Sequence, residues 1–396
     1  MASADAIMNT YKRIPVDFVR GEGSWVFDSE GNKYLDAIAG IAVCSLGHSH
    51  PGFIRAVQDQ VAQLVHTSNL YGIPQQKKLA EKLCEVSGME RVFFCNSGAE
   101  GNEAAIKLAR MYGHNREIEV PGIIVTEGAF HGRTMGALTA THSNRHQDGF
   151  APFLDGFYRM PFNDAAAVDA MVKANPNIVA ILVEPIQGEG GVVMPDSDYL
   201  KQLRQICDDN DMLLMLDEVQ TGNGRTGKYF AYQHSNILPD VFSTAKGLGN
   251  GFPIGACLAR GKAADILQPG HHATTFGGSP LACAAALAVI EAIQNEKLLE
   301  NAAVQGDRIK FGLSMRLQNA AHVVAVRGKG LMIGVELDQP CGELVALARE
   351  KSILINVASG NVVRLVPPLN ITEDESDEII ETVSALIAGF QGGKAK

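Results

Sequence analysis

The amino-acid sequence predicts an α/β fold in two parts: a large domain on a mostly parallel sheet, and a smaller α+β domain. From about residue 90 to residue 258, short apolar runs recur, with helical segments between several of them. Such alternation is typical of a parallel sheet covered by helices on both faces. After the helical stretch that begins at Pro280, strands and amphipathic helices follow in a different pattern, which indicates a separate α+β unit.

The first elements are expected near the start of the chain. Strands are predicted at 24–28 and 33–36, around a Ser-Glu-Gly-Asn turn. A Gly/His loop at 47–51 follows, and then a helix at 75–86 with its apolar residues on one face. We expect residues 1–50 to join the small domain.

The large domain is expected over residues 51–290 and the small domain over residues 291–396. Strands of the large domain are predicted at 92–94, 123–125, 178–183, 212–216, 241–242 and 254–258, with helices at 100–112 and 198–209. In the small domain we predict strands at 331–337, 353–356 and 362–366, and helices at 342–351 and 373–390. The last helix begins at a capping box, Thr372-Glu-Asp-Glu375.

Composition excludes several classes of function. The net charge is -10, from 34 Lys and Arg against 44 Asp and Glu, and no basic cluster is present, so nucleic-acid binding is not expected. The seven cysteines are far apart and form no CxxC pair, which predicts free thiols in an intracellular protein. No signal peptide or membrane-spanning stretch is visible. We therefore expect a cytoplasmic protein that acts on small molecules.

Two motifs suggest other functions and are rejected. Gly222–Gly227 reads GxGxxG and almost a P-loop, but Tyr229 stands where a P-loop needs Ser or Thr, and 217–221 separates the glycines from the strand. A nucleotide-binding NTPase or dehydrogenase is thus the alternative from another class. The pair His48-x-His50 lacks nearby acidic or Cys ligands, so we predict turn histidines and no metal site.

A phosphate site is predicted at Asn96-Ser-Gly-Ala-Glu100, between a strand and a helix. Ser97 and Glu100 fit a capping box, which defines the first turn of the helix. Gly98 and Ala99 leave backbone N–H groups uncovered at the positive end of the helix dipole. An ordinary helix cap would show the same pattern.

Two charged residues follow apolar strands. Asp217 follows the strand predicted at 212–216, and Lys246 follows another strand and precedes a glycine-rich segment. The carboxyl ends of parallel strands border the crevice where α/β proteins bind ligands. A turn-forming aspartate and a surface lysine are the alternatives. Together, a phosphate cup, a carboxylate for a pyridinium nitrogen and a lysine fit pyridoxal 5′-phosphate.

The sequence resembles the class-III aminotransferases of fold type I, a family of pyridoxal-phosphate-dependent transferases, and among them those that act on acetylornithine. The likeness extends from Gly21 to about Phe390. It rests on the segments FFCNSGAEGNEAAIKLAR, AFHGRTMGALTAT, VEPIQGEGGV, LDEVQTGNGRTG, STAKGLGNGFPIGA, TTFGGSPLACAAA and VVRLVPPLNI. The resemblance implies a two-domain homodimer whose active sites are shared between subunits.

The resemblance also implies a role for individual residues. Lys246 would form the Schiff base with the cofactor, and Asp217 would bind the ring nitrogen; both are expected to be catalytic. Further cofactor contacts are implied for Ser97, Gly98, Ala99, Phe130, Val219, Gln220 and, from the neighbouring subunit, Thr275. Substrate contacts are implied for Arg133, Glu189, Thr274 and Arg364. Glu189 would mask Arg364 for one substrate and release it for the other.

The implied reaction moves the δ-amino group of N2-acetyl-L-ornithine to 2-oxoglutarate in arginine biosynthesis, by a ping-pong mechanism. Similar enzymes that act on ornithine carry a tyrosine where this chain has Ile41. An unpaired buried polar group costs about 1–3 kcal/mol, so a site without that hydroxyl should favour an acylated amine over a free α-ammonium. Succinylornithine, ornithine and 4-aminobutyrate are the alternative substrates.

Overall fold

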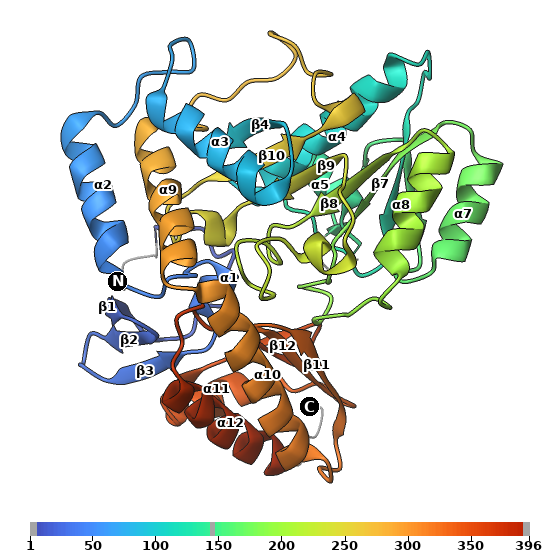
Figure 1. Cartoon of the computed structure of the whole chain (residues 1–396). Helices are drawn as coiled ribbons and strands as arrows, with labels where there is room; N and C mark the ends of the chain where they lie inside the picture. Colours follow the sequence, from blue (N-terminus) through green and yellow to red (C-terminus); the bar gives the residue numbers. More distant parts are fainter. Residues whose placement is uncertain (1–5, 143–146, 391–396) are drawn as a thin grey trace.

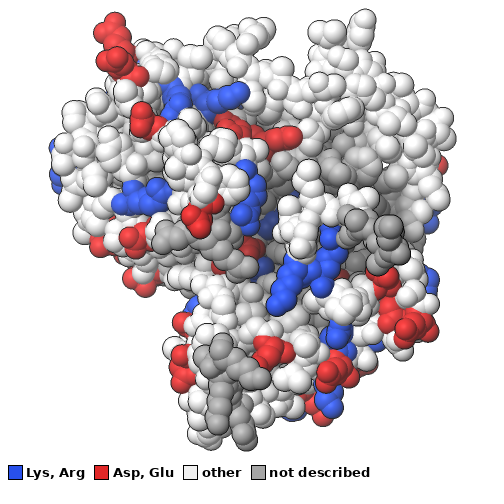
Figure 2. Space-filling view, turned by 180° about the vertical axis from the view of Figure 1, so that it is seen from behind, with Lys and Arg blue, Asp and Glu red and all other residues white. Residues whose placement is uncertain are grey.

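The computed structural model describes residues 6–142 and 147–390, and its strands form three sheets. Figure 1 shows a larger part above, built on the seven-stranded sheet, and the two four-stranded sheets below it. None of the helices within the described ranges combines the length and the apolar character needed to cross a bilayer. On the face shown in Figure 2, basic and acidic side chains are interspersed.

The seven-stranded sheet has the order β4-β10-β9-β8-β7-β5-β6. Its strands are β4 Arg91–Cys95, β5 Gly122–Thr126, β6 Phe157–Met160, β7 Ile178–Val183, β8 Leu213–Asp217, β9 Val241–Thr244 and β10 Gly255–Ala259. The strands from β9 to β6 pair in parallel, and only β10 runs antiparallel to its two neighbours. The predicted mostly parallel sheet is thus confirmed.

Helices cover both faces of this sheet. They are α2 Pro51–Gln63, α3 Pro74–Ser87, α4 Gly98–His114, α5 Met135–Ala140, α7 Ala165–Ala174, α8 Tyr199–Asp209 and α9 Pro280–Asn295. Alternate residues of β8 enter two separate cores: Leu213 and Met215 pack with α4, whereas Leu214 and Leu216 pack with α8. Because each central strand is buried on both faces, it shows as a continuous apolar run in the sequence.

The lower part contains the two four-stranded sheets. One has the order β1-β2-β3-β13, with β1 Phe18–Glu22, β2 Trp25–Asp28, β3 Lys33–Asp36 and β13 Ile353–Leu354. The other has the order β11-β12-β15-β14, with β11 Val323–Lys329, β12 Met332–Leu337, β14 Asn356–Ala358 and β15 Val362–Leu365. The strand predicted at 353–356 is therefore two strands, because the chain leaves one sheet at Ile355 and enters the other.

The remaining elements complete the chain. They are α1 Ala39–Ala42, the 3-10 helices η1 Ala231–Ser235, η2 Lys246–Leu248 and η3 Gly261–Ala263, and the helices α10 Leu298–Leu317, α11 Leu344–Glu350 and α12 Glu373–Ala388. At the start of α12, Thr372 Oγ1 accepts from Glu375 N and the Glu375 carboxylate accepts from Thr372 N, which confirms this capping box.

The division into residues 1–50, 51–290 and 291–396 stays a proposal. It is supported by the parallel pairing of β3 with β13, which joins the N-terminal strands to the C-terminal part. The boundary after residue 290 lies inside α9, whereas the helical path breaks at Lys297, which adopts a left-handed φ of 55°. We therefore propose Lys297 as an alternative boundary.

The glycine-rich loop 222–227 fastens the two parts of the chain together. Arg225 is buried, and its Nη1 donates to the carbonyl oxygens of Leu331 and Pro367. Burial lowers the pKa of this guanidinium to about 9. The backbone at Gly330 packs closely against this loop on one side and against α10 on the other. A Cβ on Gly330 would lie 2.5 Å from the carbonyl carbon of Thr226, and a Cβ on Gly306 would overlap the Gly330 carbonyl. The loop is thus a junction between the two parts.

This stacking gives a prediction for Gly306, which lies inside α10. Helix propensity alone favours Gly306→Ala by about 0.5–1 kcal/mol. The added methyl would overlap backbone atoms of Gly330 that cannot rotate away, and overpacking costs about 1–3 kcal/mol or more. We expect a net loss of stability, measured as a lower midpoint in thermal unfolding. Gly342→Ala, where a Cβ meets nothing within 4 Å, is the control. An unchanged midpoint for Gly306→Ala would contradict the prediction.

Candidate active site

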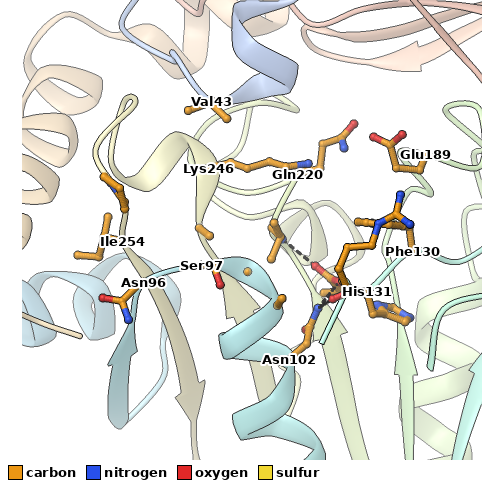
Figure 3. Close-up of a pocket in the computed structure, with 18 of the residues that line it drawn as sticks. Val43, Asn96, Ser97, Asn102, Phe130, His131, Glu189, Gln220, Lys246 and Ile254 are labelled. Atoms are coloured by element: carbon orange, nitrogen blue, oxygen red, sulfur yellow. Dashed lines mark hydrogen bonds and ion pairs between the residues drawn. The ribbon is translucent and has the colours of Figure 1, made fainter. Parts of the chain in front are cut away.

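A cavity of about 390 Å³ opens at the carboxyl ends of the central strands. Segments that follow β4, β5, β7, β8 and β9 line it, so side chains far apart in sequence meet at one edge of the sheet. Figure 3 shows Lys246 and Gln220 on one side of this space and Ser97, Asn102 and His131 on another. Ten of the predicted site residues line it: Ser97, Gly98, Ala99, Phe130, Arg133, Glu189, Asp217, Val219, Gln220 and Lys246.

The N-terminus of α4 points at the cavity. Ser97 is its N-cap residue, and its side chain accepts a hydrogen bond from Glu100 N. The other half of the predicted capping box is wrong, because the Glu100 carboxylate bonds Asn96 N and Asn96 Nδ2 instead of Ser97 N. The first backbone N–H groups of a helix lack partners within it, so Gly98 and Ala99 present donors suited to a phosphate.

The glycine at position 98 is required by close packing. A Cβ there would lie 2.6 Å from the side chain of Val219, which also lines the cavity. The helix N-terminus and the segment after β8 therefore approach each other more closely than any larger residue permits. A flat ring bound against Val219 would lie within reach of the helix N-terminus.

Asp217 is buried in the cavity wall, at 4% exposure, and its carboxylate accepts hydrogen bonds from three groups. Its Oδ2 accepts from Asn102 Nδ2 at 2.7 Å and from His131 Nδ1 at 2.8 Å, and its Oδ1 accepts from Val219 N at 3.0 Å. Asn102 is itself held by Ser243 Oγ. Neither His131 nor Asn102 was predicted from the sequence, although His131 directly follows Phe130.

Glu184 is a second buried carboxylate beside Asp217. The register places Val183 opposite Leu216, so Glu184 and Asp217 follow neighbouring strands at the same level. Its oxygens accept from Phe130 N and Gly188 N, each at 2.9 Å. Burial, reinforced by the negative charge of Asp217, raises the pKa of Glu184. Sequence reasoning missed Glu184, although it directly follows an apolar strand, as Asp217 does.

Lys246 lies in the first turn after β9 with a left-handed φ of 44°, which a non-glycine residue rarely adopts. Strain of this kind is common at functional sites. Burial lowers the pKa of the Lys246 amine, which favours the neutral form that attacks carbonyl carbons. Behind it there is no space for a side chain at Gly247, where a Cβ would lie 2.5 Å from Ser45 Oγ.

Two arginines differ in their surroundings. Arg364, on β15, is fully buried. Its Nη1 donates to Glu189 Oε1 at 2.7 Å and to Gln220 Oε1 at 3.1 Å. Its Nε donates to Asn356 Oδ1. Burial works to raise the pKa of Glu189, but the charge and hydrogen bond of Arg364, together with Lys246 and Gln220, outweigh it, and the pKa is lowered. Arg133 is exposed at the cavity, with its guanidinium 5.5 Å from the centre of the Phe130 ring.

Three residues considered in the sequence analysis lie elsewhere. Thr274 and Thr275 border a different hollow, together with Asn69 and Gln76, and not the cavity that Lys246 faces. Thr274 Oγ1 accepts from Asn96 Nδ2 at 3.4 Å, beside the N-cap residue Ser97, but within a single chain neither threonine lines the cavity. Ile41 does not line the cavity either, and is 38% exposed, whereas Val43 does line it.

The two histidines of the rejected metal motif have structural partners. His48 Nε2 lies 2.9 Å from Asp36 Oδ2. His50 is the N-cap residue of α2, where its Nδ1 accepts from Phe53 N, and its Nε2 lies 2.9 Å from Glu296. His48 thus lies in an isolated bridge with Gly23 and His50 at a helix start, so neither lies in a turn as predicted, and both have structural contacts.

Known proteins resemble this chain over nearly its whole length. The family model described as aminotransferase class-III matches residues 6–387. The acetylornithine aminotransferase of Nitrosomonas europaea is 55% identical over 98% of this chain and 99% of its own length. The acetylornithine aminotransferase 1 of Bordetella pertussis is 50% identical over 98% of each chain.

Solved structures show the same architecture. The N-acetylornithine aminotransferase of Stenotrophomonas maltophilia is 37% identical, with a TM-score of 0.83, over 96% of this chain and 97% of its own. The ornithine aminotransferase of Toxoplasma gondii is 34% identical, with a TM-score of 0.93, over 96% of this chain and 92% of its own, and PLP partly occupies its active site. The two-part α/β architecture is thus that of the fold-type I transferases.

The residues around the cavity fit pyridoxal 5′-phosphate. The N-terminus of α4 suits the phosphate, the buried Asp217 carboxylate suits a protonated ring nitrogen, and the Lys246 amine suits the aldehyde. Phe130 and Val219 line the same cavity, and their apolar side chains suit the faces of a ring. With this fit and the matches above, the chain belongs to the class-III aminotransferases, which use pyridoxal 5′-phosphate to move amino groups.

Proposed function

We propose that this enzyme transfers the δ-amino group of N2-acetyl-L-ornithine to 2-oxoglutarate, giving N-acetyl-L-glutamate 5-semialdehyde and L-glutamate. The observation that carries this is the ion pair between Arg364 and Glu189, at 2.7 Å, at the border of a cavity that the exposed Arg133 lines. The relatives named acetylornithine aminotransferase support it. We further propose that the reaction serves arginine biosynthesis in the cytoplasm.

The two arginines match the two kinds of substrate. Acetylornithine carries one carboxylate, whereas glutamate and 2-oxoglutarate carry two. While Glu189 covers Arg364, Arg133 is the one arginine among the described residues lining the cavity, and it is open to bind a carboxylate in a bidentate manner. When Glu189 leaves Arg364, a second carboxylate site opens. One cavity can then accept a δ-amine in one half-reaction and an α-amine in the other.

The protein's own groups have separate tasks in the reaction. Pyridoxal 5′-phosphate, when bound, supplies an aldehyde for the amino group and a ring that stabilises negative charge on the reacting carbon. Asp217, fixed by His131 and Asn102, holds the proton on the ring nitrogen. Lys246 Nζ anchors the cofactor and carries the proton taken from the substrate carbon.

Lys246→Ala tests the assignment of the catalytic base. We expect turnover to fall by more than about 10²–10⁴-fold, the contribution of general acid–base catalysis alone, because the covalent anchor is lost as well. The assay is formation of glutamate from 2-oxoglutarate with acetylornithine as donor. The control is Lys262→Ala, since Lys262 pairs with Asp211 on the surface. A mutant that turns over near the parent rate would show that Lys246 is not the catalytic lysine.

The same assay ranks the donors by kcat/KM. We expect acetylornithine or its succinyl analogue to exceed ornithine and 4-aminobutyrate. Ornithine or 4-aminobutyrate in first place would overturn the proposed substrate class.

Arg364→Ala tests the second carboxylate site. Hydrogen bonds to charged groups contribute about 1.5–3 kcal/mol each, so we expect KM for 2-oxoglutarate to rise by about 10- to 100-fold. The KM for acetylornithine should change much less, because this donor does not need Arg364. Steady-state kinetics with each substrate varied in turn measures both. Similar increases for the two substrates would argue against the role of Arg364 as a site for the second carboxylate.

We also propose a homodimer with shared active sites, in which Thr275 reaches the partner's phosphate and Thr274 contacts substrate. In support, Thr275 is exposed and its neighbour Phe276 is 66% exposed. Leu70 and Tyr71 are also exposed, at 87% and 70%, on the segment whose Asn69 bonds Thr274 O. Exposed apolar residues grouped in this way are suited to a second copy of the chain.

Mixing two inactive variants tests the sharing. In a heterodimer of Lys246→Ala and Thr275→Asp, one site would collect both defects and the other neither. We expect activity to recover toward one active site per heterodimer. The fraction of heterodimer is measured separately, with different tags on the two chains. Heterodimers without activity would mean that each site is built from one chain.

A further inference from the structure

The turn that carries Glu189 is held from both sides of the cavity. On the side of the large sheet, Gly188 N donates to Glu184 at 2.9 Å. At the base of the turn, Gln187 and Val193 exchange backbone hydrogen bonds. From the small sheet, Arg327 Nε donates to Val192 O and Arg327 Nη2 donates to Gly191 O, both at 2.8 Å. Strands from opposite parts of the chain therefore fix the same five-residue turn.

Arg327 and Arg364 lie in one row of the small sheet. Arg327 on β11 pairs with Gly334 on β12, and Gly334 pairs with Arg364 on β15. Directly paired residues of antiparallel strands place their side chains on the same face. The glycine between the arginines leaves room for the turn, because a Cβ on Gly334 would lie 3.0 Å from Val192 Cβ. One arginine thus binds the backbone of the turn, and the other binds its Glu189 side chain.

The backbone of the turn has little freedom to move. A Cβ on Gly190 would lie 2.8 Å from Gly128 O, and one on Gly191 would lie 2.9 Å from the side chain of Val362. Arg327 is fixed in turn by its ion pair with Glu336 on the neighbouring strand. Displacing the turn would break these contacts together.

The side chain of Glu189 has more space than its backbone. It lines the active-site cavity and also a neighbouring cavity of about 660 Å³, bordered by Gly190, Ser359 and Gly360. Figure 3 shows the Glu189 side chain near Gln220 at the margin of the active-site cavity. A change in its side-chain torsions can therefore remove the carboxylate from Arg364 without moving the turn.

We propose that Arg327 is a positioning residue for recognition of the two substrates. Arg327 fixes the backbone of the turn that carries Glu189. Arg364 is then uncovered by rotation of the Glu189 side chain into the neighbouring cavity. This inference rests on the proposed function, because it concerns how Arg364 is covered for acetylornithine and uncovered for glutamate. Without the hydrogen bonds from Arg327 to Gly191 O and Val192 O, the backbone of the turn is less fixed. Glu189 then pairs with Arg364 for a smaller fraction of the time.

The test compares the two half-reactions on the holoenzyme. Stopped-flow absorbance after mixing with acetylornithine alone or glutamate alone gives the second-order rate constant for each donor. For Arg327→Met we expect the ratio of acetylornithine to glutamate to fall by about three- to tenfold, the usual size of such indirect couplings. Arg308→Met is the matched control, since Arg308 pairs with Asp377 on the far helices, and its ratio should not change. An unchanged ratio in Arg327→Met overturns the inference.

A double variant separates an action through Glu189 from general damage. Glu189→Gln alone should lower the same ratio, and Arg327→Met added to it should lower the ratio no further. An additional, independent fall in the double variant would overturn the inference and leave the proposed function intact. If Glu189→Gln itself leaves the ratio unchanged, or the parent enzyme does not use acetylornithine, the proposed function fails and the inference fails with it.

Arg327→Lys serves if the methionine variant does not fold. Lysine keeps the charge beside Glu336 but lacks the planar fork that reaches two carbonyls. We expect a smaller fall of the ratio in the same direction. No change in a folded Arg327→Lys enzyme would overturn the inference.

Discussion

Two buried carboxylates at the ends of neighbouring parallel strands are the constraint on which the site depends. A buried carboxylate is costly unless hydrogen bonds satisfy it. Asp217 accepts hydrogen bonds from His131, Asn102 and the backbone amide of Val219. Glu184 accepts them from the backbone amides of Phe130 and Gly188. Several of the segments that line the cavity are therefore held by the hydrogen bonds that satisfy these two carboxylates.

The small sheet completes the site by supplying charge of the opposite sign. Arg364 reaches across to Glu189, and Arg327 reaches the backbone of the same turn. Loop 222–227 holds the two parts together through Arg225 and the close stacking of Gly330. The distance between the cofactor pocket and Arg364 is consequently set by packing between the two parts.

The sequence predicts the centre of the fold better than its margins. Five of the seven large-sheet strands are buried throughout or nearly so and appear as apolar runs. The missed strands β1, β6 and β11 are all edge strands with few buried residues, so they lack such a run. Predicted strand boundaries were wrong where long-range contacts decide the pairing. The strand predicted at 353–356, for example, is divided between two sheets.

The same distinction holds for the site. Asp217 and Lys246 follow apolar strands, and that position predicts a place at the cavity. His131 and Asn102 contact Asp217 across 86 and 115 positions, and Arg327 contacts Val192 across 135, so no local pattern marks them. Glu184 is different, because its position directly after β7 was a usable signal.

Burial of Arg364 makes the uncovering of this residue depend on the substrate. With Glu189 rotated away, its remaining partners are the neutral oxygens of Gln220 and Asn356. Leaving a buried charge without its counter-ion costs about 3–5 kcal/mol, so the uncovered state is sparsely populated by itself. A ligand shifts such an equilibrium only by its differential affinity for the two states. Glutamate and 2-oxoglutarate provide this differential affinity, because their second carboxylate takes the place of Glu189. A donor with one carboxylate, bound at Arg133, does not provide it. The same buried pair thus keeps Arg364 covered for one substrate and yields to the other.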